Sequence, residues 1–112
     1  MFYISSSIIK EPNTSLVLSS SLRVAFSSFL KSYSLESLKN KVSCINIAPG
    51  PTKTTRVKEL ITDIKSYEKK LPLKHLCNPD EIGKFVRFVV KNKIISLNGT
   101  TITFDSNLIR GL

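Results

Sequence analysis

Residues 42–54, with the sequence VSCINIAPGPTKT, constrain the fold more than any other stretch of this chain. The apolar run over residues 42–48 ends at Pro49 and Gly50, and small hydroxylated and basic residues follow. This pattern predicts a buried strand that leads into a turn at its carboxyl end. Open α/β sheets place their ligand crevices at that end of the strands. The rest of the chain can be placed relative to this strand and turn.

The sequence before this strand predicts another strand and a long helix. Residues 2–9, FYISSSII, predict a short strand that ends in a serine cluster, because aromatic and β-branched residues favour strands and serines favour their ends. Residues 16–38 predict the helix, and we expect Thr14 or Ser15 to cap its first turn.

The apolar residues of this predicted helix cover a wide arc. Four recur at helical spacing and three more widen the same face: Leu18, Leu22, Ala25, Phe29, Phe26, Leu30 and Tyr33. A helix that is apolar over so wide an arc usually packs against a sheet and also against a second helix. Its many serines are small enough to allow close approach. Two interpretations remain open for this helix, an ordinary core helix and a subunit interface.

The sequence after the Pro-Gly turn predicts two helices and a last strand. Residues 55–70 show helical periodicity. A second helix is expected to begin at Asn78, with Pro79 at its first position and Glu81 placed to complete a capping box. Residues 100–105, TTITFD, predict the final strand.

The order strand, helix, strand, helix, helix, strand predicts an α/β fold. We expect a three-stranded, mostly parallel sheet with flanking helices, and a single domain over residues 1–112. Three strands are few for a parallel sheet, which normally has both faces covered. The outer edge of the first strand therefore needs a cover or another chain.

Composition and cysteine usage narrow the class of protein. The sequence has no run of about 18 apolar residues, so we expect no membrane span. Its start lacks the basic and long apolar blocks of a secretory signal. Cys44 and Cys77 form no CxxC pair and have only His75 to join them, which argues against a metal site. We expect two reduced thiols and a cytoplasmic location.

The formal net charge of +9 allows several kinds of anionic partner. The basic residues are spread along the chain and lack an aromatic-interleaved basic motif, which argues against nucleic-acid binding. Lys53 and Arg56 lie near the Pro-Gly turn, where they could attract a nucleotide or another anionic ligand. The alternative interpretation is a lysine-rich solvated surface.

Four segments, in this order, resemble the carboxyl-terminal half of a Rossmann-type short-chain dehydrogenase/reductase. They are YISSS, LRVAFSSFLKSYSLESL, VSCINIAPGPTKT, and NPDEIGKFVRFVV followed by LNGTTITFD. The nearest type is the 3-oxoacyl-acyl-carrier-protein reductase. Each segment alone is weak evidence, whereas the ordered set covers nearly the whole chain.

The resemblance implies catalytic positions, two of which are substituted here. In the family, a serine orients the substrate carbonyl, a tyrosine transfers the proton, and a lysine lowers the tyrosine pKa and binds the nicotinamide ribose. Ser6 matches the serine, the tyrosine position holds Ser19, and the lysine position holds Arg23. A serine hydroxyl is a far weaker acid than a phenol, so we expect impaired catalysis.

The resemblance also implies NAD or NADP as cofactor, with part of its site missing. The positions on the nicotinamide side are Arg23, Asn46, Pro49, Gly50 and Thr54. The four glycines of the chain form no GxGxxG-like cluster, so a seat for the cofactor pyrophosphate is not expected. Binding of the whole cofactor by this chain is therefore in doubt.

Three function classes remain. The first is a truncated or degenerate oxidoreductase that is inactive alone. The second is an oligomeric binding module that pairs with itself or with a chain supplying the missing half. The third, disfavoured by the dispersed basic residues, is a nucleic-acid-binding domain. We expect a homo-oligomer.

Overall fold

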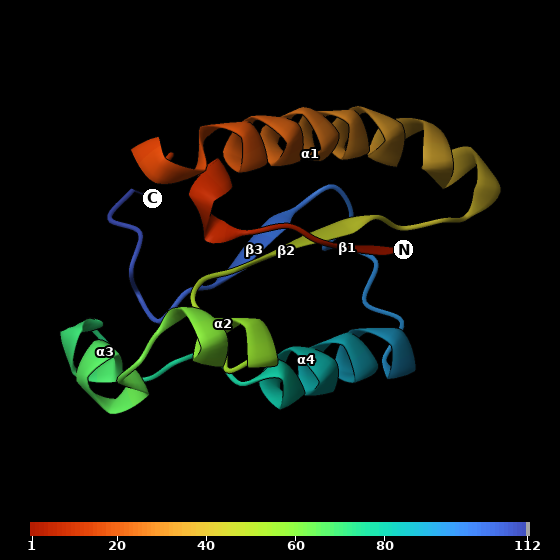
Figure 1. Ribbon diagram of the computed structural model, residues 1–112. Coiled ribbons are helices and arrows are strands. Elements are labelled where there is room, and N and C mark those ends of the chain that lie inside the picture. Colours follow the sequence, from red (N-terminus) through yellow and green to blue (C-terminus); the bar gives the residue numbers. More distant parts are fainter. Residues whose placement is uncertain (112) are drawn as a thin grey trace.

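Three parallel strands form the centre of the molecule, and helices cover both faces of their sheet (Figure 1). The computed structural model describes residues 1–111. The sheet order is β1-β2-β3, with bounds β1 Phe2–Ile4, β2 Ile45–Pro49 and β3 Thr101–Phe104. The helices are α1 Val17–Ser37, α2 Thr55–Leu60, α3 Ile64–Lys70 and α4 Pro79–Lys91. This architecture confirms the predicted α/β fold with its parallel three-stranded sheet.

Strand register assigns the side chains to the two faces of the sheet. Phe2 lies opposite Ile45, and Ile47 lies opposite Ile102. Because neighbouring residues of a strand point to opposite faces, these apolar side chains share the face beneath which α4 runs. The buried residues of this core cluster are Ile45, Ile47 and Val89. The main hydrophobic core therefore lies between the sheet and α4.

Helix α1 covers the other face, and it turns mostly serines toward the sheet. Its buried residues are Ser20, Leu30, Ser34 and Ser37. Ser20 Oγ donates to the carbonyl of Leu16 at 2.8 Å, and the other two buried hydroxyls also bond within the helix. Since these hydroxyls are satisfied locally, the helix can approach the sheet closely without needing partners there.

The predicted apolar face of α1 points away from the sheet. Leu18 is 75% exposed, Leu22 is 64% exposed and Phe29 is 57% exposed. The interpretation of this arc as an ordinary core is therefore wrong within a single chain, and only Leu30 of the predicted set is buried.

Several element boundaries differ from those predicted. Two short 3₁₀ turns, η1 at Ser7–Ile9 and η2 at Thr14–Leu16, replace the end of the first predicted strand and the start of the long helix. Asn13 caps η2 by accepting a hydrogen bond from Ser15 N, so neither Thr14 nor Ser15 is the cap. A third 3₁₀ turn, η3 at Leu38–Asn40, follows α1.

The predicted helix over residues 55–70 is two helices. Helix α2 ends where Ile61 adopts an extended conformation, and α3 begins after Asp63, whose carboxylate accepts from Ser66 N at 3.0 Å. The side chain of Asp63 can start a new helix because it satisfies an otherwise free N–H of the first turn. By contrast, α4 begins as predicted, with Asn78 as N-cap and the full capping box to Glu81.

The Pro-Gly turn brings the ends of β2 and β3 together. Gly50 N donates to Phe104 O at 2.9 Å. A Cβ on Gly50 would lie 2.8 Å from the backbone Cα of Asp105, so only glycine allows this approach. At Gly83, on α4, an added Cβ would meet no described atom within 4 Å.

We expect Gly50→Ala to lower the free energy of unfolding by about 1–3 kcal/mol, because the methyl group forces β2 and β3 apart. Gly83→Ala is the matched control and should raise the free energy by about 0.5–1 kcal/mol, since glycine disfavours a helix interior. Urea unfolding of both variants measures these changes. Equal stability of the two variants would contradict this account of the turn.

Candidate functional site

The candidate site lies at the carboxyl edge of the sheet, where the chain leaves β1, β2 and β3. Ser6 follows β1, the Pro49-Gly50 turn ends β2, and Asp105 follows β3. Of the predicted positions, the structure therefore brings Ser6, Pro49 and Gly50 to one edge. Ser19 and Arg23 lie near the start of α1, the helix that covers the other face of the sheet.

Ser6 has a local structural role. It is the N-cap of η1 and accepts a hydrogen bond from Ile8 N at 3.5 Å. The η1 turn lies against α1 and β2 and so fixes the path of the chain after β1. The half-buried hydroxyl could still donate a proton to another acceptor.

Ser19 and Arg23, the two positions to which the resemblance assigns the tyrosine and the lysine, bind each other. The Arg23 guanidinium donates to Ser19 Oγ and, at 3.3 Å, to the carbonyl of Ser19. These residues are one helical turn apart, which brings their side chains together on the same face of α1. The arrangement contains a cation and a hydroxyl but no phenol that could transfer a proton near neutral pH.

Asn46 points from β2 toward α1 and away from the turn. It is 3% exposed, and its Nδ2 donates to Ser27 Oγ and Thr101 Oγ1, each at 3.2 Å. Its Oδ1 is buried and finds no hydrogen-bond partner among residues 1–111. In this structure Asn46 therefore joins α1 to both β2 and β3.

The backbone after the Pro-Gly turn uses most of its N–H groups internally. Gly50 donates to Phe104, Lys53 donates to Cys77, and Thr54 donates to the carbonyl of Thr52. Pro51 has no N–H. Within the described chain, the N–H of Thr52 is the group of this turn without a partner.

Thr54 caps the next helix. Its hydroxyl accepts a hydrogen bond from Val57 N at 3.3 Å at the start of α2, and the residue is exposed. Thr54 thus fixes the direction in which the chain leaves the turn.

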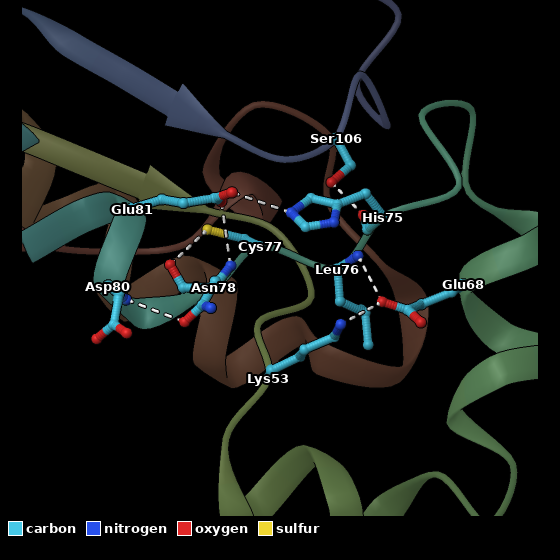
Figure 2. Close-up of polar contacts among 9 residues, drawn as sticks. All are labelled: Lys53, Glu68, His75, Leu76, Cys77, Asn78, Asp80, Glu81 and Ser106. Carbon is cyan, nitrogen blue, oxygen red and sulfur yellow. Dashed lines mark hydrogen bonds and ion pairs between the residues drawn. The ribbon is translucent and has the colours of Figure 1, made fainter. Parts of the chain in front are cut away.

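Lys53 is held by an ion pair that the sequence did not reveal (Figure 2). Its Nζ lies 2.8 Å from Glu68 Oε1, and the same carboxylate oxygen accepts from Leu76 N at 3.1 Å. The Lys53 charge is therefore largely neutralised by Glu68, while Arg56 is exposed on α2. An anionic ligand near this turn would have to compete with Glu68 for Lys53.

A second group of contacts fixes the segment that leads into α4 (Figure 2). His75 Nε2 lies 3.1 Å from Glu81 Oε1, and Asn78 N donates to Glu81 Oε2 at 3.2 Å. Ser106 Oγ donates to the carbonyl of His75. The capping box was visible in the sequence, but no pattern there joined His75 to Ser106.

The pKa values of the titratable groups in these contacts are shifted in directions that support a structural role. The Lys53 ammonium and then the Leu76 N–H lower the pKa of Glu68 below its usual 4.5. The Asn78 N–H is the main cause that lowers the pKa of Glu81. Burial, and then the Glu81 carboxylate, raises the pKa of the Cys77 thiol. A protonated, buried thiol is a poor nucleophile and a poor metal ligand.

Two absences bear on the chemistry of residues 1–111. No three side chains of the metal-ligating types histidine, cysteine, aspartate and glutamate gather closely enough in this part of the chain to hold a metal ion. None of its helices is long and apolar enough to cross a membrane.

Comparison with known proteins identifies a class of fold. Nearly the whole chain superimposes on solved reductases of the Rossmann type. YwfH, described as an NADPH-dependent reductase involved in bacilysin biosynthesis, matches 99% of this chain and 47% of its own, with a TM-score of 0.89 and 16% identity. The 3-oxoacyl-[acyl-carrier protein] reductase from Brucella melitensis, solved with NAD, matches 96% of this chain and 43% of its own, with a TM-score of 0.85 and 16% identity.

Sequence comparison points to a family within this class. Acetoacetyl-CoA reductase of Acinetobacter sp. (strain RA3849) is 33% identical over 82 residues, which cover 71% of this chain and 33% of that protein. Other matches are described as short-chain dehydrogenases or reductases. No family model matches the chain. These findings confirm the resemblance to the short-chain dehydrogenase/reductase family, and the chain spans less than half the length of these relatives.

We expect the stability of the chain to fall as the pH is lowered. The carboxyl groups of Glu68 and Glu81 have pKa values in the folded chain that lie below their ordinary value. Their contribution to stability is therefore present above about pH 4.5 and is lost as the pH falls through the lower folded-state pKa. Urea unfolding between about pH 6 and about pH 3 measures the loss.

The matched variants for this experiment are Glu68→Gln and Glu59→Gln. Glu68→Gln should flatten the acid dependence, because it removes the carboxylate that pairs with Lys53. Glu59 is exposed on α2, so Glu59→Gln should leave the dependence unchanged. Identical acid profiles for both variants would show that the Lys53–Glu68 pair does not stabilise the fold.

Proposed function

We propose that this chain is one half of a short-chain oxidoreductase related to the 3-oxoacyl-acyl-carrier-protein reductases, and that it does not reduce carbonyl substrates by itself. The observation that carries the proposal is the Arg23–Ser19 contact at the position where the resemblance places the proton donor. A serine hydroxyl cannot take the role of a phenol at the same free-energy cost. The strands and turns around the site are therefore present, whereas the proton donor is absent.

The lack of a site for the cofactor pyrophosphate is a second reason to expect inactivity. YwfH is an NADPH-dependent reductase and the Brucella reductase was solved with NAD, so the relevant ligand for a comparison is such a dinucleotide. A pyrophosphate needs a glycine-rich turn at a helix N-terminus. Here Gly50 closes the sheet, Gly83 lies inside α4 and Gly99 occupies a left-handed turn. These residues do not fit a whole dinucleotide.

This chain retains only part of a site for the nicotinamide end of the cofactor. Thr52 N–H is available at the turn, and the partly buried Arg23 on α1 supplies a positive charge. One N–H and one cation are too few contacts for tight binding of a mobile ligand, which must lose its freedom on binding. We therefore expect any cofactor contact to depend on residues outside this chain.

An oligomeric binding module is the second candidate function. The exposed apolar residues of α1 favour it, because a monomer rarely leaves such a contiguous apolar patch in water. A homo-oligomer, as expected from the sequence, would cover this surface with a second copy. The two free, buried cysteines fit a reducing compartment such as the cytoplasm.

We expect the purified chain to show no oxidation of NADH or NADPH above the blank rate with acetoacetyl thioesters as substrates. Fluorescence titration should likewise show no saturation at cofactor concentrations up to about 1 mM. Saturable binding with turnover by the isolated chain would contradict the proposal.

The control for the missing proton donor is the double variant Ser19→Tyr with Arg23→Lys. We expect this variant to remain inactive alone, because it restores the phenol and the lysine but not a pyrophosphate seat. Carbonyl reduction by the double variant would show that the cofactor seat is present after all.

A further inference from the structure

The turn that leads into β3 contains a chemically labile pair of residues, Asn98 and Gly99. Asn98 is the one asparagine of the chain that is followed by glycine. In such a pair, the backbone nitrogen of the glycine can attack the side-chain carbonyl carbon of the asparagine. Because glycine has no side chain to obstruct the approach, deamidation of asparagine is fastest when glycine follows it.

The fold engages both groups that take part in this reaction. Asn98 Oδ1 accepts a hydrogen bond from Cys44 N at 2.7 Å, and Asn98 Nδ2 donates to Ser34 O at 3.0 Å. Gly99 N, the attacking atom, donates to Cys44 O at 2.7 Å, and Cys44 is fully buried. This nitrogen attacks only after it has lost its proton, which here lies in a hydrogen bond to a buried carbonyl. The reaction therefore requires the turn to open.

The fold also depends on both residues of the pair. Gly99 has a φ of 72°, in the left-handed region that favours glycine, and a Cβ there would lie 2.7 Å from Ser34 Oγ. Lys31 Nζ donates to Gly99 O at 2.8 Å. Asn98 joins α1, through Ser34, to the residue that precedes β2, Cys44. The residues that close this turn are therefore the same residues that make it chemically labile.

The product of deamidation does not fit these contacts. Ring closure forms a bond between Gly99 N and Asn98 Cγ, and the side-chain nitrogen leaves as ammonia. Water then opens the succinimide ring to aspartate or isoaspartate, so one water is consumed for each ammonia released. Aspartate has no N–H to donate to Ser34 O and places a carboxylate beside that carbonyl. Isoaspartate adds a methylene group to the backbone and so displaces Gly99 N from Cys44 O.

We propose that Asn98–Gly99 is a modification site that reacts only when the chain opens. The folded chain suppresses deamidation there, and a chain that deamidates while unfolded loses the contacts that close the turn. The rate in the folded protein then follows the small population of the open form. Unfolding of this chain becomes progressively irreversible as a result. The inference is independent of the proposed function, because no group at the carboxyl edge of the sheet takes part.

Ageing of the purified chain tests the protection. The chain is incubated at one mildly alkaline pH, with and without guanidinium chloride, and its peptides are analysed by mass spectrometry. We expect deamidation at Asn98 to be at least about tenfold slower in the folded chain than in the denatured chain. Equal rates in the two solutions overturn the proposal.

Asn40 provides the internal reference within the same samples, because it is exposed and is followed by Lys41. In guanidinium chloride, Asn98 should deamidate faster than Asn40, since a lysine side chain hinders the attack and a glycine does not. Equal rates at the two positions in the denatured chain would overturn the assignment of Asn98–Gly99 as the labile pair.

The deamidated chain tests the loss of the turn. It carries one additional negative charge, so ion exchange separates it from the unmodified chain after ageing. We expect its folding equilibrium constant to be roughly tenfold lower than that of the unmodified chain, because Ser34 O loses its donor. Identical unfolding curves in guanidinium chloride would overturn the proposed consequence.

Matched variants separate the lost contacts from the change in charge. Asn98→Asp should reproduce the lower folding equilibrium constant, whereas Asn40→Asp introduces the same charge at an exposed position and should leave it unchanged. Equal effects of the two substitutions would assign the loss to charge alone and would overturn the role of the turn.

Discussion

The contact between the serine face of α1 and the sheet determines the arrangement of the rest of the molecule. Ser20, Ser34 and Ser37 satisfy their hydroxyls within or next to the helix, so they can be buried without partners in the sheet. Asn46 then joins the helix to β2 and β3 through Ser27 and Thr101. Because small residues occupy the inner face, the large apolar residues of α1 are directed away from the sheet. The exposed apolar face of α1 is therefore a consequence of how the helix packs.

Contacts within the chain stabilise the turns at the carboxyl edge of the sheet. Gly50 permits the close approach of β3, the Lys53–Glu68 ion pair restrains the turn, and Arg23 binds Ser19. The carboxyl edge of the sheet can therefore keep its geometry through contacts within the chain alone.

Sequence patterns predicted the elements better than their orientation. The capping box at Asn78 and Glu81 located α4 because its signal is local. Periodicity correctly placed Leu18, Leu22 and Phe29 on one face of α1, but periodicity cannot tell whether that face turns inward, which depends on the sheet. The break between α2 and α3 depended on the cap at Asp63, and Lys53 and Glu68 meet only in three dimensions. The resemblance located Ser6, Ser19 and Arg23, whose roles stay predictions.

The central claim is that β1 is the open edge of half a sheet, and amide hydrogen exchange of the isolated chain tests it most directly. Ser5 N donates to Ile47 O at 2.7 Å, whereas the alternation of a strand directs the N–H of Ile4 to the outer side. We predict that the Ile4 amide exchanges at least about tenfold faster than the Ser5 amide, since an unpaired exposed amide lacks protection. Equal protection of the two amides would contradict the account, because it would mean that the β1 edge is already covered.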